Sequence, residues 1–388
     1  MSQNHRFEFA TATRIIFGSG VIQEAGIVAK NFGRRALVVT GRDSGRAQPL
    51  LQILRSEGLS IVTYSVSHEP DIEMIQQGIA IARGENCEQV ISLGGGSALD
   101  AGKAVAVMAA NPGELLDYLE VIGRGKALAK PSLPFIAIPT TAGTGSEVTR
   151  NSVLSAPADR AKVSLRSALM LPRVALVDPE LTWDLPPATT ANTGLDALTQ
   201  LIEPYVCSRA NPMTDAFCIE GIRRAAGSLR AACENGRNAS AREDMALASL
   251  YGGLALSNAG LGAVHGLAGP LGGMFPAPHG ALCAALLPHA MAINLRALQT
   301  RQPESEALRR YEEIARWLTG NADAGAGDGI AWVSRLVSDL QIPPLRSYGI
   351  TIQDAPEVIA RGAKTSSIKA NPISLTAEEL TEIISRAL

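Results

Sequence analysis

The first half of the chain alternates short apolar runs with amphipathic stretches. The apolar runs are rich in β-branched residues and lie at 36–40, 60–66, 89–93, 134–139 and 174–178. Between them, segments 47–58 and 71–84 place apolar residues at helical spacing. Continuous apolar strands separated by helices are typical of a parallel sheet that helices cover on both faces. We therefore predict an α/β domain built on a parallel sheet, to which residues 8–18 could add an antiparallel pair.

The strand pattern ends near Pro186, and amphipathic helices follow one another from there to the end of the chain. This change predicts two domains, an α/β dinucleotide-binding domain over residues 1–185 and an all-helical domain over residues 186–388. A chain of 388 residues is also longer than one hydrophobic core usually serves. We expect a ligand to bind in a cleft between the two domains.

Composition and charge narrow the range of partners. Apolar residues make up 46% of the chain, and 35 basic against 37 acidic residues leave a formal net charge of −2. We therefore expect neither a nucleic-acid nor a membrane-surface partner. Five scattered cysteines predict reduced thiols in a cytoplasmic protein. The N-terminus lacks the pattern of a secretion signal, and the apolar segment 281–293 reads as a buried helix.

A glycine-rich turn follows the apolar run at 89–93. Gly94, Gly95, Gly96 and Ser97 lead directly into a helical stretch. Glycines let a phosphate approach the backbone closely, and the N–H groups at a helix start attract anions. The alternative is a plain strand-to-helix turn. Since no G-x-G-x-x-G follows any strand, the ordinary Rossmann fingerprint is absent.

A second polar turn follows the run at 134–139. It carries four hydroxyl groups, those of Thr140, Thr141, Thr144 and Ser146. Ligands of open α/β sheets bind at the carboxyl ends of the strands, which is where this turn lies. The alternative is a threonine-rich loop that hydrogen-bonds to its own backbone.

These segments together resemble the iron-containing (group III) alcohol dehydrogenase family. The resemblance spans the chain in order, through IIFGSG, SLGGGSALDAGKA, IPTTAGTGSEVT, LVDPELTWDLPP, TGLDALTQLIEPYV, VHGLAGPLGGMFPAPHG and the late ANP. It implies a homodimeric oxidoreductase that moves a hydride between NAD(P) and a small alcohol or aldehyde. The positions it associates with the cofactor include Asp100, Lys162 and Leu181.

The resemblance also implies a divalent metal, Fe²⁺ or Zn²⁺, which would polarise the substrate oxygen. Asp196, His265 and His279 match three of the family's four ligands and are the implied catalytic residues. Gln200, one helical turn after Asp196, stands where the family has histidine, and an amide oxygen is a poorer donor than imidazole. Gly269 is a second departure, because the family commonly has a histidine there, near the nicotinamide.

The residues after the strand at 36–40 bear on the choice of nucleotide. Family members that use NAD place an aspartate there to bind the ribose 2′-hydroxyl, whereas this chain has Gly41, Arg42, Asp43 and Ser44. Gly41 removes the carboxylate that would repel a 2′-phosphate, and Arg42 with Ser44 could bind one. We favour NADP over NAD, although Asp43 could replace the missing carboxylate, and the segment could be only a surface turn.

Three other functions remain open at this point. One is a maleylacetate-reductase-like enzyme of the same superfamily, acting on an unsaturated keto acid without metal, which Gln200 and Gly269 favour. The second is a nucleotide-binding regulatory protein that has lost catalysis, which turnover of any aldehyde would exclude. The third is a lyase or synthase on the related dehydroquinate-synthase fold, against which the second polar turn argues.

Overall fold

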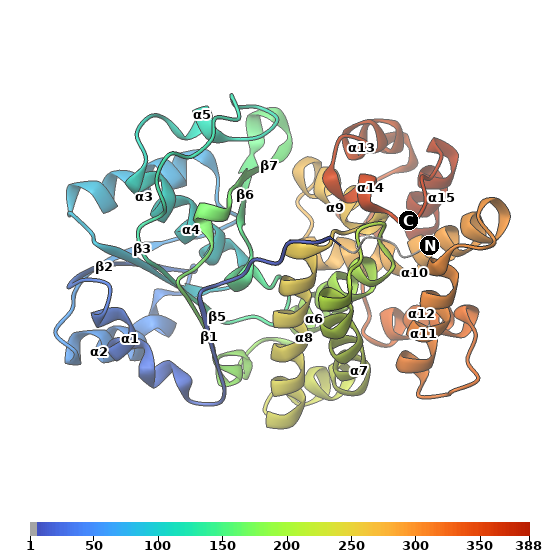
Figure 1. Ribbon diagram of the computed structural model, residues 1–388, viewed down its shortest axis with the longest axis horizontal. Coiled ribbons are helices and arrows are strands. Elements are labelled where there is room, and N and C mark those ends of the chain that lie inside the picture. Colours follow the sequence, from blue (N-terminus) through green and yellow to red (C-terminus); the bar gives the residue numbers. More distant parts are fainter. Residues whose placement is uncertain (1–5) are drawn as a thin grey trace. The chain divides into compact units, whose positions relative to one another are not determined.

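The computed structural model describes residues 6–388, so the first five residues of the N-terminal segment considered above lie outside the described part. The chain forms two compact units (Figure 1). The sheet unit comprises Ala10–Thr141 and Gly145–Trp183, and the helical unit comprises residues 6–9, Ala142–Thr144 and Asp184–Leu388.

The sheet unit is built on six parallel strands in the order β1-β8-β5-β4-β2-β3. The strands are β1 (Arg14–Phe17), β2 (Arg35–Thr40), β3 (Ser60–Ser65), β4 (Gln89–Gly94), β5 (Phe135–Pro139) and β8 (Val174–Val177). The predicted parallel sheet is therefore confirmed. The antiparallel pair expected within 8–18 is wrong, because that segment holds one strand, β1, which pairs in parallel with β8. Such pairing joins residues about 160 positions apart and leaves no local pattern.

Helices cover both faces of this sheet (Figure 1). Leu37 and Val39 of β2 pack with α3 (Ile72–Gly84) and α4 (Gly96–Ala110), whereas Ala36 and Val38 pack with α1 (Ala25–Lys30) and α2 (Gln48–Ser56). Alternate side chains of one strand thus enter two separate cores, which is why these strands read as continuous apolar runs.

An antiparallel hairpin, β6 (Asn151–Ala156) with β7 (Ala161–Arg166), completes the sheet unit. Its hydroxyl-rich sequence gave no strand prediction. The hairpin is held on α4, because the Ser152 hydroxyl donates to the carbonyl of Asp100 at 2.8 Å. The shorter elements of this unit are α5 (Leu115–Tyr118) and the 3₁₀ turns at Val21–Glu24, Ser44–Ala47, Ser146–Val148, Pro157–Asp159, Ala168–Met170 and Pro179–Thr182.

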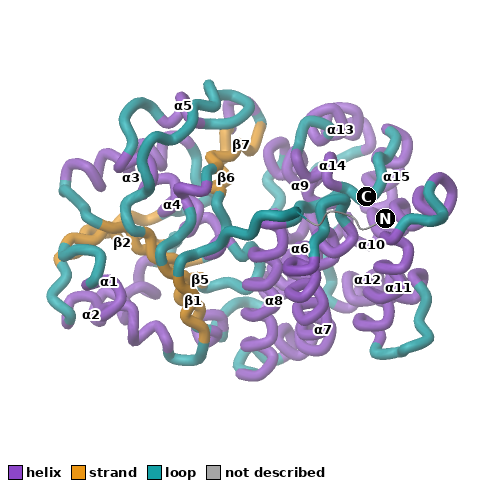
Figure 2. Tube along the Cα trace, in the orientation of Figure 1, coloured by secondary structure: helices purple, strands orange, loops and turns teal. Residues whose placement is uncertain are grey.

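The described part of the helical unit contains helices and loops and no strand (Figure 2). Its helices are α6 (Pro187–Val206), α7 (Pro212–Glu234), α8 (Ala239–Asn258), α9 (Ala263–Met274), α10 (His279–Arg301), α11 (Glu306–Thr319), α12 (Ala326–Asp339), α13 (Ala355–Gly362), α14 (Ser366–Ala370) and α15 (Ala377–Ala387), with 3₁₀ turns at Leu345–Tyr348 and Ile352–Asp354. Helix α6 packs against α7, α8 and α10, so its polar residues 196, 200 and 203 are buried.

Among the described helices, α10 alone is long and apolar enough to cross a membrane by length and composition. Within its most apolar window, 78% of the residues are buried inside the protein. Leu282, Leu286 and Leu287 belong to the hydrophobic core of the helical unit. The predicted buried helix over 281–293 is therefore confirmed, and its apolar character is explained by the core it fills.

Candidate active site

Three of the predicted nucleotide-binding segments meet at one edge of the sheet. Strands β2, β4 and β5 are neighbours, and their registers align Thr40 with Leu93 and Gly94 with Pro139. The turn after each strand therefore leaves the same carboxyl edge. The Thr140 N–H donates to the carbonyl of Gly94 at 2.9 Å, which joins two of the turns directly.

Gly95 is the residue where the glycine-rich turn touches the threonine-rich turn. A Cβ atom at Gly95 would lie 3.2 Å from Cγ2 of Thr141. Gly95 precedes the first residue of α4, and no side chain caps this helix start. The first-turn N–H groups, with the Ser97 hydroxyl beside them, thus form the kind of helix N-terminus that binds phosphate.

Asp100 and Ser146, both predicted cofactor residues, bind each other. The Ser146 hydroxyl donates to Oδ1 of Asp100 at 2.5 Å, and Oδ2 accepts from the N–H of Val153 at 2.9 Å. The Asp100 carboxylate thereby attaches the second turn and the hairpin to α4. Its role in this structure is to position the turn, and both of its oxygens are engaged by protein donors.

The same corner contains a buried lysine and a buried glutamate that the sequence analysis missed, and the lysine pairs with Asp100 at 3.4 Å. The fully buried ammonium of Lys103 donates to the carbonyl of Ser146 at 2.8 Å and to the Thr149 hydroxyl at 2.7 Å. Glu147 is also buried, and its burial raises the pKa of its carboxyl to about 7 despite the nearby Lys103. A lysine inside a helix and a glutamate inside a polar turn resemble surface residues, so no sequence signal marked them.

The segment after β2 is exposed at Arg42, Asp43 and Ser44. The Arg42 Nε donates to the carbonyl of Ser67 at 3.0 Å, and Oδ1 of Asp43 accepts from the N–H of Gly45 at 3.0 Å. Asp43 therefore caps the 3₁₀ turn that starts at Ser44. One carboxylate oxygen of Asp43 is thus occupied by a hydrogen bond from the local backbone.

The remaining predicted cofactor residues are dispersed. Thr144 belongs to the short segment that groups with the helical unit. Lys162, on β7, pairs with Glu69 at 2.7 Å. Leu181 lies in the 3₁₀ turn after β8 and packs against the core beneath α1 and α2.

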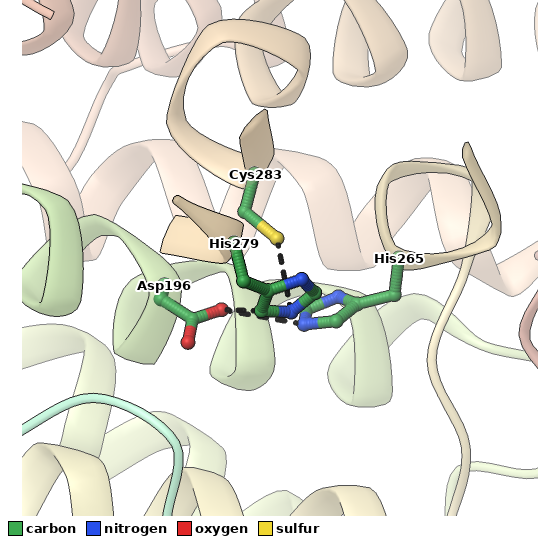
Figure 3. A group of neighbouring side chains, drawn as sticks. All are labelled: Asp196, His265, His279 and Cys283. Atoms are coloured by element: carbon green, nitrogen blue, oxygen red, sulfur yellow. Dashed lines mark hydrogen bonds and ion pairs between the residues drawn. The ribbon is translucent and has the colours of Figure 1, made fainter. Parts of the chain in front are cut away.

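The predicted metal ligands come together within the helical unit. Asp196 lies on α6, His265 on α9, and His279 is the first residue of α10. The Asp196 Oδ1 atom lies 3.4 Å from Nε2 of His265 and 3.8 Å from Nε2 of His279, and Figure 3 shows these side chains pointing toward one another. Asp196 and His265 are almost fully buried, whereas 32% of the His279 side chain is exposed.

Three buried polar atoms in this cluster face no hydrogen-bond partner among the residues that the structure describes. They are Oδ1 of Asp196, Nε2 of His265 and Oε1 of Gln200. Buried polar groups are nearly always paired, because leaving one unpaired costs about 1–3 kcal/mol. All three can donate a lone pair, so the residues present fit a divalent cation.

The charges of these groups depend on one another. Burial acts to raise the pKa of Asp196, but His279 and His265 outweigh it and hold that pKa below its ordinary value. Burial acts to lower the pKa of His265, yet Cys283, Asp196 and Glu203 raise it well above its ordinary value. Asp196 and His265 thus each favour the charged form of the other, and a cation bound between them would take the place of a proton on Nε2.

Glu203, which the sequence analysis missed, orients His265. Its Oε2 accepts from Nδ1 of His265 at 2.6 Å, and its Oε1 accepts from the N–H of Val264 at 2.7 Å. Asn371, from the late ANP segment, accepts from the N–H of Ala263 at 3.0 Å. Two side chains distant in the sequence thus cap α9, whose preceding residue, Gly262, has no side chain to do so. Only the spacing of Glu203 on α6, seven residues after Asp196, could have suggested it.

Cys283 is the other residue that sequence reasoning left outside the site. It lies one helical turn after His279, and its Sγ is 3.6 Å from Nε2 of His279 (Figure 3). Potential ligand atoms of Asp196, His265, His279 and Cys283 all lie within 4.8 Å of one another. Burial raises the pKa of the Cys283 thiol to about 12.

At Gly269, one turn after His265, a Cβ atom would meet nothing within 4 Å.

Comparison with known proteins identifies relatives over the whole length. The family described as iron-containing alcohol dehydrogenase matches residues 12–179, and the C-terminal part of the same family matches residues 190–388. The chain is 36% identical to 1,3-propanediol dehydrogenase of Citrobacter freundii, covering 98% of each protein. It is 33% identical to NAD-dependent methanol dehydrogenase of Bacillus methanolicus, over 96% of this chain and 97% of that protein.

A solved structure agrees with these matches. The crystal structure of a 1,3-propanediol oxidoreductase superimposes with a TM-score of 0.91 at 35% sequence identity, covering 99% of this chain and all of that one. Both the parallel-sheet part and the helical part are therefore found in a relative of known structure.

Proposed function

Because the chain belongs to the iron-containing alcohol dehydrogenase family, we propose that it transfers a hydride between a nicotinamide nucleotide and a small alcohol or aldehyde held at Asp196, His265 and His279. The family match confirms the predicted class, an oxidoreductase of the alcohol dehydrogenase type. The assignment of individual residues is our own proposal. Its main support is the convergence of unpartnered donor atoms from α6 and α9, with His279 beside them.

The metal ligands in this proposal are Asp196, His265 and His279. A divalent ion bound by them would supply Lewis acidity to the substrate oxygen. Glu203 keeps the proton of His265 on Nδ1, so that Nε2 presents its lone pair to the site. His279 is the most exposed of the three, and we therefore assign the approach of substrate to its side of the cluster.

The nucleotide-binding residues in this proposal follow the carboxyl edge of the sheet. We assign the pyrophosphate to the start of α4, at Gly95, Gly96 and Ser97, with Thr140 and Thr141 beside it. The support is the close approach of Gly95 to Thr141 and the uncapped helix start. Asp100 and Ser146 contribute by holding the second turn in place. Lys162, Leu181 and Thr144 stay predictions.

We propose NADP as the preferred nucleotide, with the 2′-phosphate at Arg42 and Ser44. Both side chains are exposed, and no carboxylate follows β2 directly because Gly41 takes that position. Asp43 uses one oxygen to cap the turn at Ser44, which supports a structural role for it. The homodimer and the cytoplasmic location also stay predictions, as does the choice between Fe²⁺ and Zn²⁺.

The donor cluster favours this function over a metal-free reductase of unsaturated keto acids. With glutamine at position 200, three strong donors still lie together. Buried donor atoms without partners among the described residues are costly in a site that binds no metal. Chelation of the purified enzyme distinguishes the two functions directly.

The decisive experiment combines metal analysis with a substrate screen. The purified protein is analysed for bound metal and assayed with NADH and NADPH on small aldehydes, including the aldehydes of 1,3-propanediol and methanol, the alcohols named for two relatives. We expect about one divalent ion per chain and reduction of at least one aldehyde. His279→Ala, assayed alongside, should lose both. Turnover that persists in verified metal-free protein would contradict the proposed role of the three ligands.

A further inference from the structure

We propose that the thiolate of Cys283 is the fourth protein ligand of the divalent ion, and that it replaces the donor missing at Gln200. This inference rests on the metal site of the proposed function. Cys283 is fully buried, lies on α10 one turn from His279, and directs Sγ at the same point as the two histidines (Figure 3). The second observation is that Oδ1 of Asp196 and Nε2 of His265, which lie 3.4 Å apart, are buried without a hydrogen bond among the described residues, as is Oε1 of Gln200.

Three separations between the donor atoms are close to those of ligands that share one ion, sulfur included, and the remaining ones are at most 4.8 Å. Around a Zn²⁺-sized ion, tetrahedral geometry puts two nitrogen or oxygen ligands about 3.3 Å apart, and a nitrogen and a sulfur ligand about 3.6 Å apart. The corresponding distances here are 3.4 and 3.8 Å from Asp196 Oδ1 to the two imidazoles, and 3.6 Å from His279 Nε2 to Cys283 Sγ.

Gln200 lies one helical turn after Asp196 and affects the ionisation of that residue. Gln200 helps to hold the pKa of Asp196 below its ordinary value, although its own Oε1 is buried without a hydrogen-bond partner among the described residues. The amide oxygen would also be the weakest donor of the cluster for Fe²⁺ or Zn²⁺.

Binding of the ion by a thiolate balances in atoms and protons. On metal binding the S–H bond of Cys283 breaks, a sulfur–metal bond forms, and the proton leaves to solvent. The two anions, Asp196 and Cys283, then neutralise a divalent ion in a site that is mostly buried. A sulfur donor also moves the preference of the site toward Zn²⁺.

Cobalt substitution tests this inference without relying on activity. The metal-free full-length protein is loaded with Co²⁺, and its absorption spectrum is recorded together with its cobalt content and affinity against a chelating dye. A thiolate ligand produces a sulfur-to-cobalt charge-transfer band in the near ultraviolet. Three variants are compared with wild type: Cys283→Ala, Gln200→Ala and, as a matched control, Cys218→Ala, which removes another fully buried thiol from the helical core.

We expect the charge-transfer band in wild type, Gln200→Ala and Cys218→Ala. Cys283→Ala should lose it and bind Co²⁺ at least about tenfold more weakly. If wild type binds one equivalent of cobalt without showing the band, the role of Cys283 is overturned and the proposed function stands. The same conclusion follows if Gln200→Ala loses more cobalt affinity than Cys283→Ala. Failure of wild type to bind Co²⁺, Zn²⁺ or Fe²⁺ overturns the metal-assisted function together with this inference. Absence of the band from cobalt-loaded wild type overturns the inference whether or not Cys283→Ala folds.

Discussion

The carboxylate of Glu203 accepts a hydrogen bond from Nδ1 of His265 at 2.6 Å, although the two residues are 62 positions apart in the sequence. The same carboxylate caps the start of α9 through Val264, so one side chain sets both the position of the helix and the tautomer of the ring. An imidazole whose Nδ1 carries the proton presents Nε2 to a metal ion.

Replacing Glu203 should therefore weaken metal binding without unfolding the protein. Glu203→Gln keeps the shape of the side chain but removes the charge that fixes the tautomer of His265. We expect metal affinity to fall by roughly 10–100-fold in chelator competition, with little change in the melting temperature of the metal-free protein. Glu382→Gln, at a partly exposed acid on α15 that pairs with Arg296, is the control and should keep wild-type affinity. Equal affinities in Glu203→Gln and wild type would remove Glu203 from the site.

The close approach of Gly95 to Thr141 predicts the effect of a side chain at that position. In Gly95→Val, a branched side chain would stand 3.2 Å from Thr141 Cγ2 and obstruct the N–H groups at the start of α4. We expect the dissociation constant of the nicotinamide nucleotide to rise at least tenfold, about 1.4 kcal/mol, in a fluorescence titration. Gly84→Val adds the same side chain at the end of α3, where a Cβ atom meets nothing within 4 Å, and should bind normally. A folded Gly95→Val protein with unchanged affinity would place the pyrophosphate elsewhere.

The exposed Arg42 predicts discrimination between the two nucleotides. We expect kcat/KM to be higher with NADPH than with NADH, and Arg42→Ala to lower the NADPH value about tenfold because a charged contact to phosphate is lost. The NADH value should stay the same, which makes NADH the internal control. A clear preference for NADH, lost in Asp43→Ala, would show instead that Asp43 binds the ribose hydroxyls, in line with the NAD dependence named for one relative.

The metal ligands predict opposite effects for two substitutions. His279→Ala removes an imidazole donor and should abolish metal retention together with metal-dependent turnover. Gln200→His adds an imidazole one turn after Asp196 and should raise retention against chelator, because imidazole is a better donor to Fe²⁺ and Zn²⁺ than an amide. Metal content after dialysis against chelator measures both effects. The metal-assisted mechanism would fail if wild-type enzyme kept its full rate after verified removal of the metal.

The buried Glu147 predicts a pH dependence of stability. Its pKa is raised from 4.5 to about 7 in the folded protein, so folding favours the protonated acid. The stability from this group is complete below about pH 4.5 and is lost as the pH rises through about 7. Glu147→Gln lacks this loss. At pH 8 its free energy of unfolding should exceed that of wild type by an amount on the order of 3 kcal/mol, and it should melt at a higher temperature. At pH 5 the gain should nearly vanish.

Thermal unfolding of both proteins at the two pH values checks this result. Glu85→Gln, at an exposed position after α3, is the control and should follow wild type. A gain for Glu147→Gln that is larger at pH 5 than at pH 8 would mean that the folded protein stabilises the carboxylate, through Lys103, more than burial penalises it.

The sequence by itself determined the elements and the segments that carry the chemistry. Strands β2, β4, β5 and β8 were predictable because a strand buried on both faces must be apolar throughout. The glycine-rich and threonine-rich turns were predictable because each follows such a strand. Asp196, His265 and His279 were recognised through the resemblance to a family, since no local spacing connects α6 with α9 and α10.

Only the tertiary structure decided which distant residues complete the sites. The parallel pairing of β1, the capping of α9 by Glu203 and Asn371, and the hydrogen bond from Lys103 to Ser146 all join separate elements. Cys283 belonged to an apolar helical segment, where a thiol is compatible with an ordinary core position. Its direction toward the histidines depends on how α10 packs beside α6 and α9, and packing between helices is set by the whole core and not by the local sequence.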